Sequence, residues 1–333
     1  RLRRAVAILE HYGFERTDPG EGRDDDVLRV HSAQYLDTVQ RLSVSPEELG
    51  TEAWRAGLGP GDNPTFAGMY EASLAYVSGS ATAARAVRDG DSLAISLSGG
   101  LHHAHKERAS GFCIFNDPAV AIQILRERFG RVAYVDIDVH HGDGVQWMFL
   151  DDPNVLTCSI HEEPRTLFPG TGWTSEVGAA RTSANVPLRA GTSGDTWIWA
   201  FANGLMPVLR GFEPEAIVLQ MGTDAHFLDP LAHINCAAQD WLEAVVLVRD
   251  EGVPIVALGG GGYEITCVPR MWAAACLTLA RVEFGDELPE LVRGWGMSTF
   301  FDHLAPGPTG AGMDFAMSAV ADLHANLSLN EAR

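Results

Sequence analysis

A dense run of acidic and imidazole side chains follows a short apolar stretch near the middle of the chain. The segment YVDIDVHHGDGVQ at 134–146 contains Asp136, Asp138, His140, His141 and Asp143. Alternation along a strand would place Asp136, Asp138 and His140 on one face. Carboxylates at the end of a buried strand are costly unless they are paired or bind a metal. A hydrogen-bonded structural corner would explain one Asp and one His, so this density favours a metal site.

A second group of possible ligands follows another apolar stretch. The segment LQMGTDAHFLDPLAHIN at 219–235 offers Asp224, His226, Asp229 and His233, any one of which could complete the site begun by the first cluster. Two carboxylates and one imidazole, with a position left for water, are typical of an open and therefore catalytic zinc site. Taken alone this cluster is weak evidence, because an Asp often caps a following helix.

Two adjacent histidines, His102 and His103, lie in the segment GGLHHAHKERASGFCIFND at 99–117. Adjacent residues of a strand point to opposite faces, so this pair can act together only in a loop, which Gly99 and Gly100 make plausible. Buried histidines beside spare carboxylates suggest a general acid and base pair. Two separate structural histidines are the default interpretation, but the surrounding motif favours catalysis.

A run of four glycines precedes a single tyrosine in the segment ALGGGGYEI at 257–265. A phosphate-binding loop would need the Walker spacing with its lysine, or the pattern G-x-G-x-x-G, and neither is present. A flexible turn that delivers the phenol of Tyr263 is the better interpretation. An ordinary core tyrosine is the alternative.

Short apolar runs alternate with segments of helical period from residue 91 onward. We expect strands at 92–97, 132–138, 155–160, 216–221 and 254–258. We expect helices near 2–12, 66–88, 117–129, 195–210, 237–251 and 266–280. This order predicts an α/β fold, a single domain over 1–333 with a central, mostly parallel sheet and helices on both faces. We expect the active site at the carboxyl ends of the strands, and a loose C-terminal region over 305–333.

The composition limits the class of protein. Hydrophobic residues make up 46% of the chain and charged residues 20%, which is ordinary for a folded globular protein. The formal net charge of −20 argues against nucleic acid as a partner. Five widely spaced cysteines without a Cys-x-x-Cys pair fit a reducing compartment, and no apolar run is long enough to span a membrane. We therefore expect a cytoplasmic protein that binds neither nucleic acid nor membrane.

Together the four segments resemble the histone deacetylase family of the arginase/deacetylase superfamily, and the similarity spans nearly all of the chain. Within that family, the segment GPGDNPTFAGMYEAS at 59–73 is most similar to the bacterial acetoin-utilisation deacetylases. Arg1 aligns with the start of the family's first helix, so we expect the strand that precedes this helix in the family to be missing here.

The resemblance implies two metal sites. Zn²⁺ would be bound by Asp138, His140 and Asp229. A structural K⁺ would be bound by the main-chain carbonyls of Asp136, Asp138 and His140, together with the Ser159 hydroxyl.

The resemblance also implies the catalytic residues, which are His102, His103, Asp136, Asp143 and Tyr263. Asp136 would orient His102 and Asp143 would orient His103, because such carboxylates set the tautomer of an imidazole. His103 is our preferred general base and acid. Tyr263 would hydrogen-bond the oxyanion that develops on the acetyl carbonyl.

Five positions would contact the substrate, namely Asp62, Phe112, Phe168, Cys236 and Gly261. Phe168, in the segment SIHEEPRTLFPGTG at 159–172, would face Phe112 across a narrow channel, and Asp62 would hold the backbone amide of the substrate at the rim. Two departures bear on selectivity. Cys236 stands where many eukaryotic relatives have a larger Leu or Met, and Gly61 replaces a common aromatic residue.

The implied reaction is zinc-dependent hydrolysis of the acetyl amide of N-acetyl-lysine in proteins, giving lysine and acetate. Its partner would be an acetylated protein such as a metabolic enzyme. An acetylpolyamine amidohydrolase would share this chemistry, but Asp62 favours a peptide. The triplet at Asp224 to His226 also suggests a binuclear manganese hydrolase similar to arginase. A non-catalytic module that binds acetyl ligands would be expected to lack Tyr263 or His103, and both are present.

Overall fold

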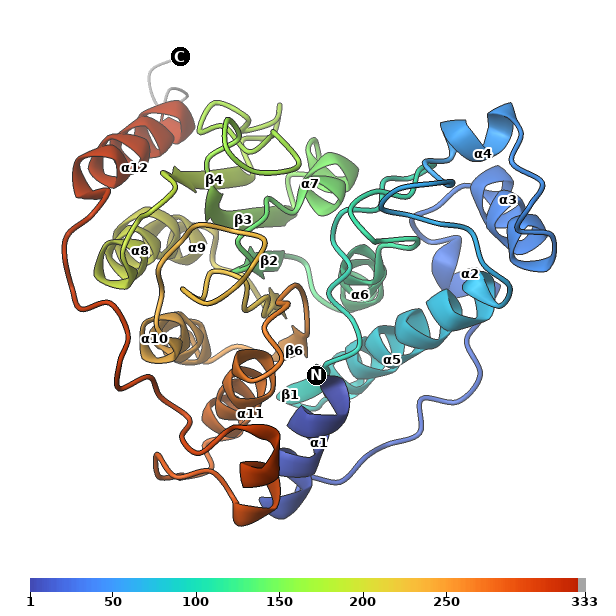
Figure 1. The fold of residues 1–333 in the computed structure, drawn as a ribbon. Coiled ribbons are helices and arrows are strands. Elements are labelled where there is room, and N and C mark those ends of the chain that lie inside the picture. The colour runs from blue at the N-terminus through green and yellow to red at the C-terminus, as the bar shows by residue number, and fades with distance from the viewer. Residues whose placement is uncertain (329–333) are drawn as a thin grey trace.

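A parallel sheet runs through the centre of the molecule in the computed structural model, which describes residues 1–328 (Figure 1). Within these residues the sheet has six strands in the order β1-β6-β5-β2-β3-β4, and every neighbouring pair is parallel. The strands are β1 (Leu93–Ser96), β2 (Val132–Asp136), β3 (Val155–Glu162), β4 (Ser183–Leu188), β5 (Ala216–Gln220) and β6 (Ile255–Leu258). The predicted α/β class with a central parallel sheet is therefore confirmed.

Helices cover both faces of this sheet, because side chains alternate along each strand. In β2, Ala133 and Val135 join one core with the helices from α8 to α12, whereas Val132 and Tyr134 join a second core with α3, α5, α6 and α7. The two helical layers lie on either side of the sheet in Figure 1. The helices are α1 (Leu2–His11), α2 (Asp24–Val27), α3 (Ala33–Val44), α4 (Thr51–Arg55), α5 (Met69–Asp89), α6 (Asp117–Leu125), α7 (Asp143–Phe149), α8 (Gly194–Ala200), α9 (Met206–Phe212), α10 (Ala238–Arg249), α11 (Cys267–Leu279) and α12 (Met313–Ser328).

The apolar runs of the sequence did not predict strand β4, whose sequence is SANVPL. This strand is at the edge of the sheet and pairs only with β3, so Pro187 costs no hydrogen bond to a further strand. The expected helix at 195–210 is interrupted, because a π-helical turn, η1 (Phe201–Leu205), separates α8 from α9. The other expected strands and helices correspond to elements of the structure.

The C-terminal region differs from the loose segment expected over 305–333. Residues 313–328 form α12, which packs against β4 and α8. Ala316, Ala319, Val320 and Leu323 are buried in this contact, and the small alanines let the helix approach the sheet closely. The expectation was therefore wrong for α12, because the glycines and prolines at 305–312 end before this helix begins. Residues 329–333 lie outside the described part of the chain.

Local capping explains where the elements near the site begin. Asn116 caps α6 by accepting a hydrogen bond from the main-chain N–H of Ala119 at 3.0 Å, and Pro118 occupies the first turn. The four clusters of polar residues follow the carboxyl ends of β1, β2, β5 and β6. Since these strands are parallel, their carboxyl ends meet at one edge of the sheet, and the clusters converge there.

Candidate active site

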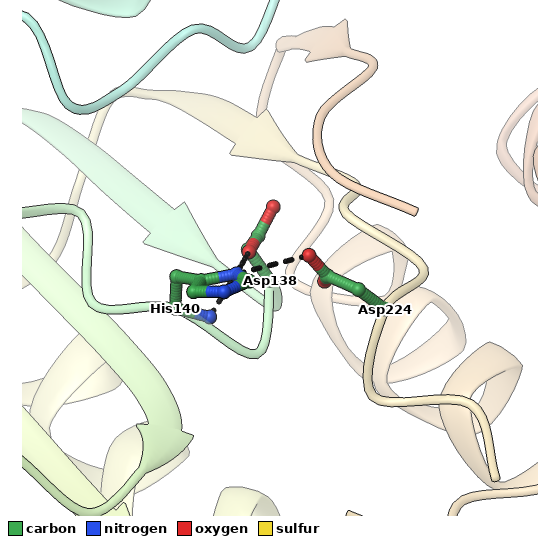
Figure 2. Close-up of side chains that lie close together, drawn as sticks. All are labelled: Asp138, His140 and Asp224. Atoms are coloured by element: carbon green, nitrogen blue, oxygen red, sulfur yellow. Dashed lines mark hydrogen bonds and ion pairs between the residues drawn. The ribbon is translucent and has the colours of Figure 1, made fainter. Parts of the chain in front are cut away.

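Asp138, His140 and Asp224 come together beyond β2 and β5 (Figure 2). One ligand atom from each residue lies within 4.8 Å of the other two, and all three residues are buried. Nδ1 of His140 is 3.1 Å from Oδ1 of Asp138 and 3.0 Å from Oδ2 of Asp224. Two carboxylates and one imidazole in such a group fit a divalent metal ion.

The glycine run after β6 lets the main chain approach these carboxylates. The main-chain N–H of Gly261 donates to Oδ2 of Asp138 at 2.8 Å, and Nε2 of Gln220 donates to the same oxygen at 2.8 Å. A Cβ atom added at Gly261 would lie 2.1 Å from Oδ2 of Asp224. Only a glycine therefore fits at this position without displacing a possible ligand.

Asp229, the third ligand implied by the resemblance, does not belong to this close group. Its Oδ2 accepts a hydrogen bond from the N–H of Tyr263 at 2.8 Å, and its Oδ1 accepts from the N–H of Leu231 at 3.0 Å. Asp229 is 8% exposed, whereas Asp224 is fully buried. Burial, followed by the charge of Asp138, raises the pKa of Asp229, so its carboxylate is close enough to be influenced by the cluster.

The carboxylates of this region repel one another. Burial and then the charge of Asp138 raise the pKa of Asp224 to about 7. Burial alone would also raise the pKa of Asp138, but His102 and His140 outweigh this and hold that pKa well below its usual range. A bound divalent cation would favour the ionised form of every carboxylate here. The electrostatics and the donor set both suit a metal ion.

His102 and His103 form a hydrogen-bonded pair beside this cluster. Their Nε2 atoms are 3.0 Å apart. Nδ1 of His102 is 2.7 Å from Oδ2 of Asp136, and Nδ1 of His103 is 2.7 Å from Oδ1 of Asp143. The structure therefore brings each histidine together with the aspartate that the family resemblance implies for it.

The two histidines differ in pKa. Burial alone would lower the pKa of His102, but Asp136 and Asp138 outweigh it and raise this pKa to about 9. Burial and then the charge of His102 lower the pKa of His103 to about 4. Within the pair, His102 therefore holds a proton more tightly than His103 does. A neutral imidazole can accept a proton, which suits His103 to the role of a general base.

The segment that carries the pair is held in place by two residues at the start of α6. Asp117 accepts hydrogen bonds from the N–H groups of Gly100 and Leu101, each at 2.9 Å. The side-chain amide of Asn116 donates to the carbonyl of His102 at 3.1 Å. These contacts place both histidines in a loop, as their joint action requires.

A cavity of about 400 Å³ adjoins the histidine pair and the cluster. Its lining includes His102, His103, Phe112, Asp138 and Gly261. The rings of Phe112 and Tyr263 lie 6.2 Å apart, and the ring of Phe168 lies 4.9 Å from that of His103. Both phenylalanines are partly exposed, so aromatic side chains flank the approach to the pair.

Tyr263 stays protonated in this environment. Burial, followed by the charges of Asp224 and Asp138, raises the pKa of its phenol well above the ordinary value. A protonated phenol can donate a hydrogen bond to a developing oxyanion.

Two expected substrate contacts are placed differently. Cys236 is 0% exposed, and its main chain pairs with Ala225 and Phe227 beneath the surface. Its expected place in the channel wall is therefore wrong for this structure, since a fully buried thiol cannot touch a substrate. Asp62, beside Gly61, is exposed in the loop between α4 and α5, and the structure gives it no hydrogen bond to the cluster or the histidine pair.

Comparisons with known proteins agree with this geometry. The model of the histone deacetylase domain matches residues 1–279. The acetoin utilization protein AcuC of Bacillus subtilis is 42% identical over 81% of this chain and 73% of its own length. Histone deacetylase 6 of Arabidopsis thaliana is 35% identical over 93% of this chain and 66% of its own length. This chain belongs to the histone deacetylase family.

Solved structures support the same assignment of the chain to the histone deacetylase family. A histone deacetylase homologue complexed with SAHA has a TM-score of 0.82 and 30% identity, covering 90% of this chain and 86% of that chain. A homologue from Aquifex aeolicus has a TM-score of 0.83 and 28% identity, covering 91% and 87%. The recognition of the family from its four motifs is confirmed, as is its similarity to the acetoin-utilisation proteins.

Several residues that support the deacetylase site were not identified from the sequence. Gln220 holds Asp138, Tyr134 donates to Asp136 at 2.8 Å, and Asp117 holds the histidine loop. A polar residue at the end of an otherwise apolar strand could have indicated Gln220, whereas Asp117 resembles an ordinary helix-capping residue. The expected K⁺ ligand Ser159 lies in β3, where its Oγ is 2.8 Å from Nδ1 of His161.

Among the described residues of the deacetylase, no helix is long and apolar enough to cross a membrane.

Proposed function

We propose that this deacetylase removes acetyl groups from lysine side chains of proteins by zinc-dependent hydrolysis, giving lysine and acetate. The observation that carries the proposal is that two kinds of chemical group lie next to each other. A buried set of metal-ligand side chains lies beside a pair of hydrogen-bonded histidines of opposite protonation preference. Amide hydrolysis needs both an activated water molecule and a group that protonates the departing amine.

Asp138, His140 and Asp229 are the proposed Zn²⁺ ligands, with Asp224 in support. A catalytic zinc site must keep one position open, which favours Asp229, which is 8% exposed, over Asp224, which is 0% exposed. The contact from Nδ1 of His140 to Asp224 is of the kind that orients a ligating histidine. A site made from Asp224 instead is the direct alternative, because this carboxylate already lies in the close group. When bound, the metal would activate water and polarise the acetyl carbonyl.

His103 is the proposed general base and then the general acid. It has the lower pKa of the pair, lines the cavity and is oriented by Asp143. His102, which has the higher pKa of the pair, would stabilise negative charge that develops during attack. The phenol of Tyr263 would donate to the oxyanion. Each of these side chains then performs one part of the hydrolysis.

The aromatic side chains of Phe112 and Phe168 would enclose the aliphatic part of acetyl-lysine. A Cβ atom added at Gly111 would come within 2.8 Å of Cε1 of Phe168, so this glycine lets the two aromatic positions lie close together. An acetylpolyamine has a similar aliphatic chain and remains the second candidate substrate. The exposed position of Asp62 is open to a peptide backbone approaching from solvent.

Three further parts of the proposal concern the surroundings of the enzyme. We place it in the cytoplasm, which fits five cysteines that form no disulfide. Its partner would be an acetylated protein such as a metabolic enzyme. A structural K⁺ would be held by carbonyls of Asp136, Asp138 and His140 and by the hydroxyl of Ser159.

The experiment compares hydrolysis of an acetyl-lysine peptide and of acetylputrescine by the purified chain. Zn²⁺, Mn²⁺ or a chelator is added in parallel, and bound metal is measured by mass spectrometry. We expect peptide cleavage that a chelator abolishes and Zn²⁺ restores. Two Mn²⁺ ions per chain would instead support an arginase-like site, and a strong preference for acetylputrescine would support a polyamine substrate.

A further inference from the structure

A groove of about 700 Å³ lies apart from the catalytic cavity. Its walls are residues 29–30, the turn at 105–108, Gln123 of α6 and residues 147–149 at the end of α7. It shares no lining residue with the cavity that contains His103. The proposed deacetylation does not use this groove.

The charge of the groove is opposite to that of the chain. Arg29, Lys106 and Arg108 line it against one carboxylate, Glu107. The whole chain has 24 basic and 44 acidic residues, and Lys106 is its only lysine. The net charge of the protein repels polyanions such as nucleic acid. An anion that binds at these cations would therefore be recognised by the local side chains of the groove.

Two of these cations are available to a ligand. Arg29 is already engaged, because it pairs with Asp26 at 3.4 Å and with Glu127 at 2.7 Å. Lys106 and Arg108 are exposed, and neither forms an ion pair with any residue of the range 1–328. Together a lysine and an arginine can bind a phosphate group, the first as a point charge and the second through paired donors.

The turn that carries both cations is held by its main chain. The N–H of His105 donates to the carbonyl of Arg108 at 2.8 Å, and the reverse bond is 3.3 Å. The carbonyl of Lys106 accepts from the N–H of Ser32 at 3.2 Å. A turn fixed in this way costs little further ordering when a ligand binds.

The part of the lining that comes from the end of α7 is largely apolar. Trp147 is 44% exposed, and Met148 and Phe149 lie next to it. An exposed indole ring provides a surface on which a heterocyclic base can stack. The volume is also in the range of small-molecule sites. Free cations and an exposed aromatic ring in one groove fit a phosphorylated molecule with an aromatic part.

We propose that this groove binds a small phosphorylated ligand of nucleotide size, with its phosphates at Lys106 and Arg108 and its base against Trp147. His105 joins the groove to the catalytic site, since its Nε2 lies 3.1 Å from Oδ2 of Asp143, the carboxylate that orients His103. A phosphate in the groove would compete with Asp143 for the N–H of His105. Ligand binding then lowers the turnover number without changing KM, because the acetylated substrate occupies the other cavity.

Isothermal titration calorimetry of the full chain with ADP, pyrophosphate and adenosine tests the binding. We expect ADP to bind more tightly than pyrophosphate and adenosine to bind weakly. The double variant Lys106→Gln with Arg108→Gln should lose at least about tenfold in ADP affinity, since each removes a charge-assisted contact. Trp147→Ala should weaken ADP but leave pyrophosphate unchanged. Arg3→Gln, an exposed arginine on α1, is the matched control and should bind ADP as the wild type does.

Two further measurements separate this proposal from the proposed function. ADP binding that persists in His140→Ala places the ligand outside the metal site, and this result does not depend on deacetylase activity. Turnover of an acetyl-lysine peptide should fall with saturating ADP in the wild type and stay unchanged in the double variant. Absence of saturable binding, or equal binding by the double variant, would overturn the proposal. So would preferential binding of an acidic peptide such as polyglutamate, while an unchanged turnover would refute the link through His105.

Discussion

Nε2 of His102 and Nε2 of His103 lie 3.0 Å apart, although the two residues are adjacent in the chain. Neighbouring side chains of a strand diverge, so this contact requires the loop that Asp117 holds at the end of β1. The two pKa values also diverge, since burial and then the charge of His102 lower the pKa of His103, whereas Asp136 and Asp138 raise that of His102. His103 is thereby suited to act as a base, and His102 is suited to supply positive charge.

The unequal pKa values predict unequal effects of mutation. We expect His103→Ala to lower the turnover number by about a hundred- to ten-thousandfold, the range for a lost general acid or base. His102→Ala should cost less and should raise the pKa of His103, because the neighbouring positive charge is removed. The pH dependence of turnover and an NMR titration of His103 measure both effects. An activity loss in His102→Ala that exceeds the loss in His103→Ala would reverse the two roles.

Asp138 and His140 belong to both possible ligand sets, so substitution of either residue should remove the metal. We expect Asp138→Ala and His140→Ala each to abolish activity and to lower bound zinc to background, because an open site cannot spare one of three protein ligands. Metal content by mass spectrometry and circular dichroism of the same samples provide the readout and the folding control. A folded variant with full zinc and full activity would exclude that residue from the site.

Variants of Asp224 and Asp229 distinguish the two possible third ligands of the zinc ion. We expect Asp229→Ala to lose the metal, and Asp224→Ala to weaken zinc affinity by only about ten- to a hundredfold, the usual effect of a residue that orients a ligand. Zinc titration against a fluorescent chelator measures both affinities. Full zinc binding in Asp229→Ala, combined with none in Asp224→Ala, would assign the third position to Asp224.

The phenol of Tyr263 should act only when the oxyanion develops. Tyr263→Phe is expected to lower turnover by about a hundred- to a thousandfold, as for other lost oxyanion donors. Bound zinc and the affinity for a substrate peptide should change little, because the ring that packs against Phe112 is kept. Wild-type turnover in this variant would show that the hydroxyl has no catalytic part.

Asp62 tests the class of substrate. A carboxylate can accept hydrogen bonds from the backbone N–H groups of a peptide, which a linear polyamine lacks, so Asp62→Asn should impair peptide cleavage selectively. The values of kcat/KM for an acetyl-lysine peptide and for acetylputrescine give the comparison. Equal peptide cleavage by variant and wild type would indicate a turn residue before Pro64 and would favour the polyamine substrate.

Much of this protein could be read from local patterns in the chain. Short apolar runs followed by polar clusters predicted five of the parallel strands and the edge at which the site forms. The strands and this edge depend on strand alternation and on the parallel arrangement of strands, both of which are visible in residue order. The contacts of His102 with Asp136 and of His103 with Asp143 were instead expected from the family resemblance.

Other features depend on which distant segments pack together, and only the tertiary structure decided them. Asp224 and Asp229 share one loop, and the packing of that loop placed Asp224 in the close group. The same packing buried Cys236, which the family resemblance had placed in the channel wall. Helix α12 packs against β4, which is distant in the chain. The cationic groove forms where residue 29, the turn at 105–108 and the end of α7 meet. Burial and charge at these places are sums over neighbours far apart in the chain, so no local pattern contains them.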